Sequence, residues 1–170
     1  VELNLLNHQS EFNLDSYFCV GLTESFNELT NDYQPENHLN KLFSALCKST
    51  NFVPEDIKKI SEKTIEENKN NSLEEISKRI IENSPKKIYY SRIFILGIYK
   101  IISSASDFKQ EEDIGKIEIL SKISIDLNIP LSRAEKDIGI YLSTLKKFEQ
   151  AKELLKETIK SEREKREKKN

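Results

Sequence analysis

Apolar residues recur every three or four positions along most of this chain, which is the spacing that places them on one face of an α-helix. In the segment 16–31, Phe18, Leu22, Phe26 and Leu29 form such a stripe. The same reasoning predicts helices over residues 1–11, 36–49, 54–69, a short segment from 72, and 110–127. Only 4 Gly and 4 Pro occur, so few positions can supply the turns that a many-stranded fold needs. The chain is therefore predicted to be all-α.

Residues that favour helix starts support two of these boundaries. Asp15 can cap the helix at 16–31, because its carboxylate can accept from a free N–H of the first turn. Ser72 with Glu75 matches a capping box, in which two side chains satisfy backbone N–H groups reciprocally. Ser132 with Glu135 matches a second box, which predicts the start of the last helix at about residue 132.

The segment from about 88 to 104 differs from the others because it is apolar on every side. Eleven of the fifteen residues from Ile88 to Ile102 are aliphatic or aromatic. Such a helix lies either in the centre of a bundle or in a membrane. A bilayer crossing needs about 20 apolar residues, whereas this segment is shorter and contains Arg92 and Lys100. We expect a central core helix around which the other helices pack.

The last predicted helix, about 132–169, is the longest, since nothing in the sequence breaks it. At about 1.5 Å per residue it would be about 57 Å long, more than the width of a small domain. A near-heptad seam of apolar residues, typical of a coiled coil, follows the helix and then stops. The seam consists of Ala134, Ile138, Tyr141, Leu142, Leu145, Phe148, Leu155 and Ile159. We expect residues 1–130 to form a bundle, and 131–170 to pack on it with their first half and protrude with the rest.

Charge is distributed unevenly along the chain. Residues 146–170 carry a net charge of +4, whereas the whole chain carries −2. The basic residues near 160–169, the basic tip, do not predict nucleic-acid binding, because glutamates alternate with the lysines and arginines and no aromatic residue is present there to stack on nucleobases. Peripheral contact with an anionic membrane stays open on the same charges, although no apolar face continues beyond Ile159.

Residue patterns that would support catalysis or metal binding are not found in the sequence. Cys19, Cys47, His8 and His38 lack the close local pairing of zinc ligands. Unpaired cysteines without a disulfide framework fit a reducing interior such as cytoplasm or stroma. No glycine-rich phosphate loop and no Ser-His-acid pattern is present. We expect a protein without cofactor or enzymatic activity.

Packing is the favoured interpretation for several central residues. Gly97 in the apolar segment would let a neighbouring backbone approach closely. Arg92 in the same segment needs an acidic partner or a route to the surface, and a groove for a partner protein is the alternative. The residues to which we assign a structural role are Phe43, Leu46, Cys47, Tyr90, Gly97, Tyr99, Tyr141 and Leu145.

The order of several short segments resembles the thylakoid formation protein family over most of the chain. These segments are VELNLL at the start, Phe18 and Gly21, YQPE at 33–36, FSALC at 43–47, and YSRIFILGIY at 90–99. Matches in the last helix region are Pro130, Lys136-Asp137, Tyr141, Leu145, Lys147, Gln150-Ala151 and Leu154. The stretch 61–86 matches poorly, and the family's basic, aromatic-rich N-terminal segment has no counterpart.

This resemblance implies an all-helical, non-catalytic factor on the cytoplasmic or stromal face of the thylakoid. It also implies a role: association with membrane-bound FtsH protease complexes, which sustains their level and supports the photosystem II biogenesis and repair machinery. The residues alone indicate only a helical binding module. Two alternatives remain, a scaffold that self-associates through the seam at 134–159 and an RNA-binding protein that uses the basic tip.

The exposed half of the last helix is the first candidate for a partner surface. Its candidate residues are Gln150, Glu153, Glu157, Arg163 and Arg166. The second candidate is the turn formed by Tyr33, Gln34 and Pro35, in which Tyr33 either packs inward or serves as an exposed anchor. Arg92 is the third.

Overall fold

The computed structural model describes residues 3, 5, 12, 14–35, 37–85, 88–107 and 113–167. All regular structure in these residues is α-helical, which confirms the predicted fold class. The helices are α2 (Ser16–Leu29), α3 (Asn37–Lys48), α4 (Pro54–Asn68), α5 (Leu73–Asn83), α6 (Arg92–Ser103), α7 (Asp113–Asp126) and α8 (Leu131–Glu167). The helix predicted at 1–11 lies almost entirely outside the described residues.

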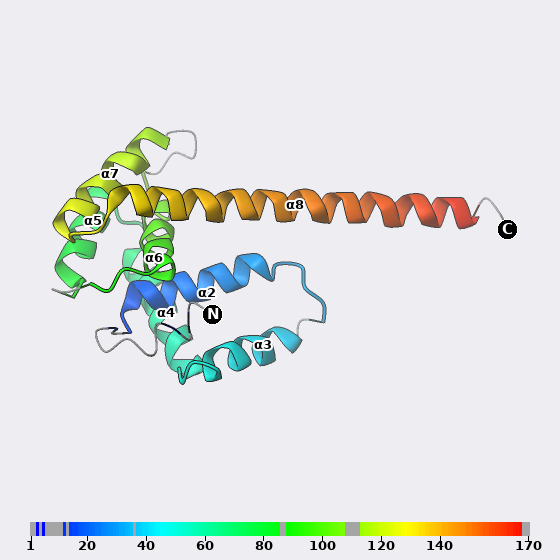
Figure 1. Ribbon diagram of the computed structural model, residues 1–170, viewed down its shortest axis with the longest axis horizontal. Coiled ribbons are helices and arrows are strands. Elements are labelled where there is room, and N and C mark those ends of the chain that lie inside the picture. The colour runs from blue at the N-terminus through cyan, green and yellow to red at the C-terminus, as the bar shows by residue number, and fades with distance from the viewer. Residues whose placement is uncertain are drawn as a thin grey trace. The chain divides into compact units, whose positions relative to one another are not determined.

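The chain divides into two compact units, Val1–Ile138 and Gly139–Asn170, and the boundary lies inside α8. The first unit contains α2 to α7 and the first two turns of α8. The second contains the rest of α8, the long helix drawn from yellow to red in Figure 1. A terminal helix of 37 residues confirms the predicted long helix. That its distal half extends away from the bundle stays a prediction.

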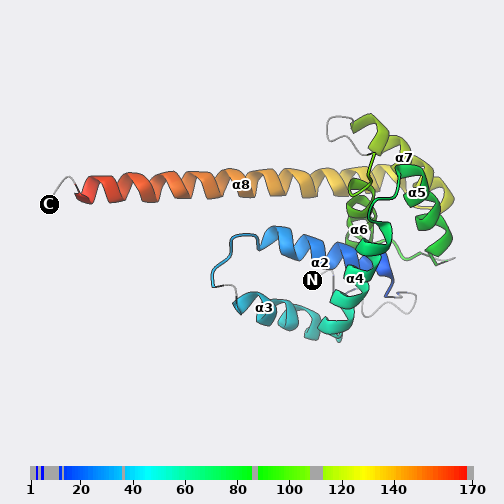
Figure 2. The same cartoon turned by 180° about the vertical axis from the view of Figure 1, so that it is seen from behind.

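Within the first unit, helix α2 packs mainly against α6 and α4. Figure 2 shows the same three helices from behind. The contact with α6 is close because two glycines meet there. A Cβ atom on Gly97 would stand 1.7 Å from the carbonyl oxygen of Tyr17, and one on Gly21 would stand 1.9 Å from that of Ile93. Only glycine fits at either position, so these two residues set how closely the helices approach.

Large apolar side chains fill the space around this crossing. One cluster of buried residues joins α2, α3 and α4, and it consists of Phe18, Cys19, Leu22, Phe43, Cys47 and Ile57. In α6, the residues from Phe94 to Ile98 and both Ile101 and Ile102 are buried. An apolar central helix was predicted from the sequence, and the burial of α6 confirms it.

The start of this central helix was predicted wrongly. The apolar run begins at Ile88, but residues 88–91 are not helical and α6 begins at Arg92. The reason is local, because the Ser91 side chain accepts a hydrogen bond from the Phe94 N–H and caps the helix. Periodicity cannot locate this boundary, since the residues just before it are as apolar as the helix itself.

Other helix ends follow their caps. Asp15 accepts from the Phe18 N–H at 2.8 Å, and Ser72 with Glu75 forms a complete capping box; both predictions are confirmed. The second predicted box is wrong, because α8 already begins at Leu131 and Ser132 therefore lies within its first turn. Pro130 precedes this helix, and its carbonyl accepts the first hydrogen bonds.

Asparagines in the left-handed conformation follow three of the described helices, with Asn70 (φ 68°) after α4 among them. Asn51 has φ 57° after α3, and Asn128 has φ 52° after α7. After α7 the Ile129 N–H donates to the Ser124 carbonyl at 2.7 Å, and after α3 the Phe52 N–H donates to the Cys47 carbonyl at 3.0 Å. These bonds define Schellman motifs. They direct the chain sharply into the next segment.

Within the second unit, α8 continues the heptad seam as far as Ile159. Positions 141, 145, 148, 152, 155 and 159 alternate in steps of four and three, and Lys152 takes one of them. Tyr141 is buried and Leu145 half-buried, whereas Phe148, Leu155 and Ile159 are exposed.

In the described part of the chain, no helix is long and apolar enough to cross a membrane.

Candidate functional site

A buried carboxylate connects the start of α6 with the first turns of α8. Asp137 is only 7% exposed. Its Oδ2 accepts a hydrogen bond from the Tyr90 hydroxyl at 2.7 Å, and its Oδ1 lies 3.2 Å from Arg92 Nε. Both oxygens therefore have a partner, as a buried charge requires. Arg92 thus has the acidic partner that its place in an apolar segment called for.

Arginine also covers the ring of Tyr90. The guanidinium carbon of Arg133 lies 4.5 Å from the centre of the Tyr90 ring, in cation–π geometry. Burial of the hydroxyl, together with its hydrogen bond to the Asp137 carboxylate, raises the pKa of Tyr90. The phenol therefore stays a neutral donor at physiological pH. The arrangement can hold α8 on α6, but it offers no group poised for proton transfer.

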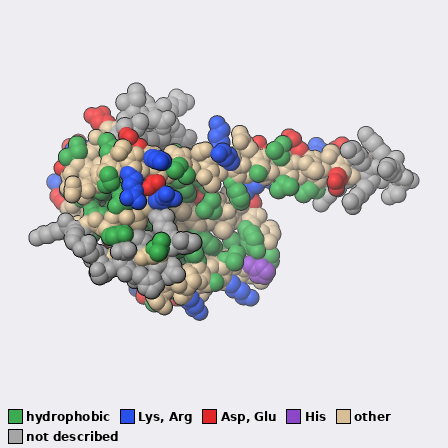
Figure 3. All heavy atoms as spheres, in the orientation of Figure 1, with side chains coloured by type: hydrophobic (Ala, Val, Ile, Leu, Met, Phe, Trp, Pro, Cys, Tyr) green, Lys and Arg blue, Asp and Glu red, His purple; other side chains and the backbone are tan. Residues whose placement is uncertain are grey.

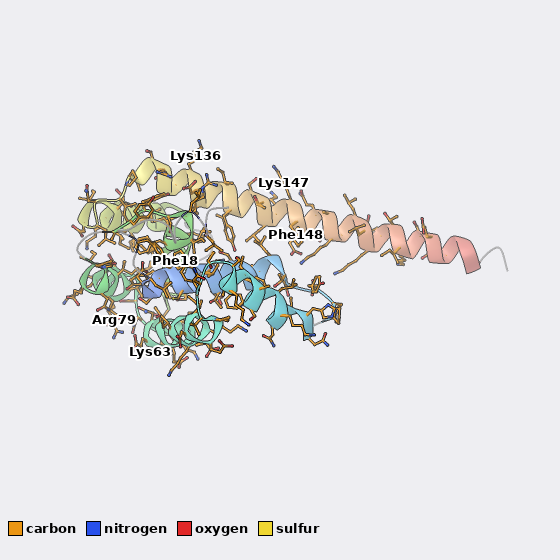
Figure 4. The ribbon with its side chains drawn as sticks, turned by 60° about the horizontal axis from the view of Figure 1, so that its bottom comes forward. Phe18, Lys63, Arg79, Lys136, Lys147 and Phe148 are labelled. Atoms are coloured by element: carbon orange, nitrogen blue, oxygen red, sulfur yellow. The ribbon has the colours of Figure 1, made fainter. Side chains whose placement is uncertain are left out.

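The other residues with a predicted structural role are buried or half-buried. Phe43, Cys47, Gly97 and Tyr141 are buried, and Leu46, Tyr90, Tyr99 and Leu145 are half-buried. Figure 4 shows Phe18 of the same core within the first unit, whereas Lys63, Arg79 and Lys136 carry their charges outward.

The predicted turn at Tyr33, Gln34 and Pro35 lies at the surface. All three residues are exposed, and the Gln34–Pro35 peptide bond is cis. Tyr33 is 42% exposed, so it does not pack inward fully. The nearby Leu29 and Leu42 are exposed to similar extents, 40% and 44%. The turn is therefore accessible to a partner.

The candidate residues of α8 fall into two groups, one on a polar face and one whose side chains the structure does not describe. Gln150, Glu153 and Glu157 share one polar face with Leu154 and line a shallow hollow along it. A hollow lined by four residues of one helix cannot enclose a small molecule, because side chains from a single helix cannot surround it. The side chains of Arg163 and Arg166 lie outside the described residues.

The seam lies on a different face of the same helix. At 100° per residue, Phe148, Lys152, Leu155 and Ile159 fall within one narrow stripe, and Leu154 faces away from it. Figure 4 shows Lys147 and Phe148 on different sides of α8. The Lys152 ammonium lies 5.1 Å from the centre of the Phe148 ring and 3.0 Å from Glu149 Oε1. A cation thus stands within an otherwise apolar seam.

Neither a metal nor thiol chemistry is favoured by the described residues. Among them, no group of three His, Cys, Asp or Glu side chains is placed to hold a metal ion. Cys19 and Cys47 are free and buried. Burial raises the pKa of the Cys19 thiol to about 12 and also raises that of Cys47. Neither thiol is a reactive thiolate at physiological pH.

Asp137 is the residue whose role sequence reasoning missed. The need of Arg92 for an acid was recognised, but the partner lies 45 positions later in the sequence. One signal was present, since Asp137 lies between Ala134, Ile138 and Tyr141 of the apolar seam. A carboxylate beside the buried stripe of a helix needs a partner from another element.

Comparison with known proteins gives consistent matches over nearly the whole chain. The family described as Thylakoid formation protein matches residues 1–88 and 55–170. The chain is 55% identical over 167 residues to Protein Thf1 of Prochlorococcus marinus subsp. pastoris (strain CCMP1986 / NIES-2087 / MED4), which covers 98% of this chain and 83% of that protein. It is 52% identical over 157 residues to Protein Thf1 of Prochlorococcus marinus (strain MIT 9312). That match covers 92% of this chain and 78% of that protein.

A solved structure shares the fold. The structure of Psb29 superimposes with a TM-score of 0.82 at 25% identity, and the match covers 97% of this chain and 83% of that one. The likeness extends over both units of the chain, each of which is helical in its described residues.

Proposed function

Because the chain belongs to the thylakoid formation protein family, we propose that it is a non-catalytic accessory factor of the FtsH protease. In this proposal it binds membrane-bound FtsH complexes, sustains their level, and thereby supports photosystem II biogenesis and repair. It acts at the cytoplasmic or stromal face of the thylakoid membrane, and needs no cofactor and no nucleic acid. The observation that carries the proposal is the family match over both units.

The structure supports a binding role in two ways. Polar groups that could have formed a catalytic centre are used for packing, as with Tyr90, Arg92 and Asp137. In the second unit, by contrast, large apolar side chains are exposed on a single helix: Phe148 by 42%, Leu155 by 62% and Ile159 by 50%. Exposed apolar side chains at heptad spacing are typical of a surface that another helix covers.

The first test is co-purification from thylakoid membranes. The tagged full chain is expressed in a cyanobacterial strain that lacks its own homologue, and FtsH is measured in the captured fraction after mild detergent. We expect capture by the full chain and its loss when residues 146–170 are deleted. Full capture by the deleted chain would exclude residues 146–170 as the binding element, and no capture by the full chain would overturn the proposal.

The second test measures the consequence in the cell. The same strain, with and without the chain, is exposed to strong light, and FtsH abundance and recovery of photosystem II activity are followed together. We expect both to fall without the chain and to be restored by it. Recovery that is unaffected by the chain would contradict the proposed role even if binding were found.

A second candidate function is a helical scaffold that self-associates through the seam at 134–159. The exposed side chains of Phe148, Leu155 and Ile159 favour it, because a second copy can cover them as well as a partner can. Light scattering over a range of concentrations would then show a dimer that Leu145→Glu abolishes. A monomer at all concentrations would exclude this candidate.

A further inference from the structure

The exposed part of the seam on α8 has a chemical character that specifies its partner. We propose that Phe148, Lys152, Leu155 and Ile159, called the distal seam below, form the docking surface for an acidic amphipathic helix of another protein. This inference rests on the proposed function, since it names the kind of segment through which an FtsH complex, or a protein bound to it, would be held.

The width of the distal seam matches one partner helix. Its four residues follow the steps of four, three and four that occupy the a and d positions of a coiled coil. On the face of α8 that Figure 3 shows, hydrophobic side chains lie between charged ones and do not merge into a broad patch. A helix that lies in a membrane surface buries a wider apolar face. The narrow stripe therefore favours a helix over a lipid surface.

Basic residues follow one flank of the distal seam. Lys152, Lys156 and Lys160 recur at intervals of four, so they form a ridge along one side of the helix, and Lys156 and Lys160 are exposed. Lys152 is the innermost of the three, with a side chain only 17% exposed, and its ammonium pairs with Glu149 on the same flank at 3.0 Å. A partner helix with carboxylates opposite this ridge would gain charge complementarity along its length.

The same lysine argues against a parallel second copy. In a parallel, in-register pair, residues at a positions face their own counterparts, so Lys152 would meet Lys152 of the other helix within the seam. Like charges placed together at a partly dehydrated contact oppose association. An acidic residue at the matching position of a different helix would instead join Glu149 beside the Lys152 ammonium and add no like charge to the contact.

The remaining surface of α8 disfavours docking of an acidic helix on the face away from the distal seam. Gln150, Glu153 and Glu157 lie away from the distal seam and are polar or acidic. An acidic helix would be repelled by this face and attracted by the distal seam with its ridge of lysines. Leu154, which is 64% exposed, stands on the same far side. It lies next to Leu155, which is 62% exposed and belongs to the distal seam.

These two leucines allow a matched experiment. Leu154→Asp and Leu155→Asp make the same chemical change in neighbouring residues of equal exposure on one helix, so their effects on folding should be equal. The probes are two synthetic helical peptides of about four heptads, with leucine at a and d positions and either Glu or Lys at the flanking positions. Binding to the full chain is measured by fluorescence anisotropy.

We expect the Glu peptide to bind and the Lys peptide to bind at least about tenfold more weakly. Leu155→Asp should weaken binding of the Glu peptide about tenfold or more, as for a residue at the centre of an interface, while Leu154→Asp leaves it within about twofold. Lys152→Glu should reverse the preference between the two peptides. Circular dichroism confirms that each variant keeps its helical content.

Equal effects of the two leucine variants, or equal binding of both peptides, would overturn the inference. So would a wild-type dimer that Leu155→Asp dissociates, because a second copy would then occupy the seam. Binding to vesicles that contain anionic lipid, lost in Leu155→Asp but not in Leu154→Asp, would assign the seam to the membrane. If the chain discriminates between the two peptides but does not capture FtsH, the proposed function alone is refuted. If both leucine variants capture FtsH equally, this inference alone is refuted.

Discussion

The backbone nitrogen of Gly97 lies only 2.8 Å from the position that a Cβ of Gly21 would occupy, so α2 and α6 touch backbone to backbone at this pair. Gly97→Ala would place a methyl group 1.7 Å from the Tyr17 carbonyl oxygen. The helices would have to separate, and the side chains packed around them would lose contacts. We expect a loss of about 3 kcal/mol in the free energy of unfolding, measured by urea denaturation, because overpacking typically costs 1–3 kcal/mol and backbone atoms yield little.

Gly139 supplies the matched control for this substitution. It lies inside α8, and a Cβ there would meet no atom within 4 Å. Gly139→Ala should therefore increase stability by about 0.5–1 kcal/mol, since alanine is the better helix former. Destabilisation by both variants to the same extent would show that the close contact of α2 and α6 is not what Gly97 provides.

The second prediction concerns the Tyr90–Asp137 hydrogen bond. Tyr90→Phe should cost about 1.5–3 kcal/mol, because it removes a hydrogen bond to a charged group. Asp137→Ala should cost at least as much, because it removes the same bond together with the ion pair to Arg92. In the double variant the two losses should fall short of additivity by about 1 kcal/mol or more. The measurement is a double-mutant cycle by urea denaturation, and additive losses would contradict direct coupling.

The variant Arg92→Met distinguishes a structural role of the cluster of Tyr90, Arg92 and Asp137 from a role in binding a partner. The Arg92 side chain is 57% exposed, whereas that of Asp137 is 5% exposed. Arg92→Met would leave one oxygen of a buried carboxylate without its partner, so it should cost about 1–3 kcal/mol. Capture of FtsH should not change if the residue serves only to orient Asp137. Reduced capture at unchanged stability would instead place Arg92 in a partner surface.

Much of the fold could be predicted because each helix signals itself locally. The stripe of Phe18, Leu22 and Phe26 specifies one face of α2 without reference to any other segment. The box of Ser72 and Glu75 fixes the start of α5 in the same way. Contacts between distant segments carry no such signal. Both Gly21 and Gly97 are visible in the sequence, but nothing there states that they meet, and Asp137 gives no sign that its partners lie 45 and 47 positions earlier.

The candidate site was predictable to a similar degree. A heptad pattern in α8 indicated a seam, and its exposure beyond Leu145 follows from the structure. Gln150, Glu153 and Glu157 were candidates from the sequence because a charged helix has no intramolecular reason to extend so far. Sequence reasoning did not separate the two faces of α8, since that separation needs the register of the helix together with the burial of each side chain.

Asn128 supports a fourth prediction, because it ends α7 with a positive φ of 52°. A residue with a Cβ is strained in this region, and Asn tolerates it better than most while Gly has no penalty. Asn128→Ala should therefore lower the free energy of unfolding by about 1 kcal/mol, whereas Asn128→Gly should leave it unchanged or raise it slightly. Thermal denaturation of both variants checks this. A glycine variant less stable than the alanine variant would show that the Asn side chain, and not the backbone conformation, matters here.

The last prediction concerns the pH dependence of stability at Asp15. Burial raises the pKa of this carboxyl from 3.8 to about 6, although the Phe18 and Tyr17 N–H groups act in the opposite direction. Between these two values the folded chain binds more protons than the unfolded chain, so the contribution of Asp15 to stability is greatest at low pH and is lost as pH rises through about 6. Asp15→Asn keeps a capping oxygen but does not titrate. Its stability relative to the wild type should therefore increase from pH 4 to pH 7, by at most about 3 kcal/mol, in urea denaturation at a series of pH values. Asp15→Ala is the control, since it loses the cap at every pH. A difference between wild type and Asp15→Asn that stays constant over this range would mean that the carboxyl titrates at its ordinary pKa in the folded chain.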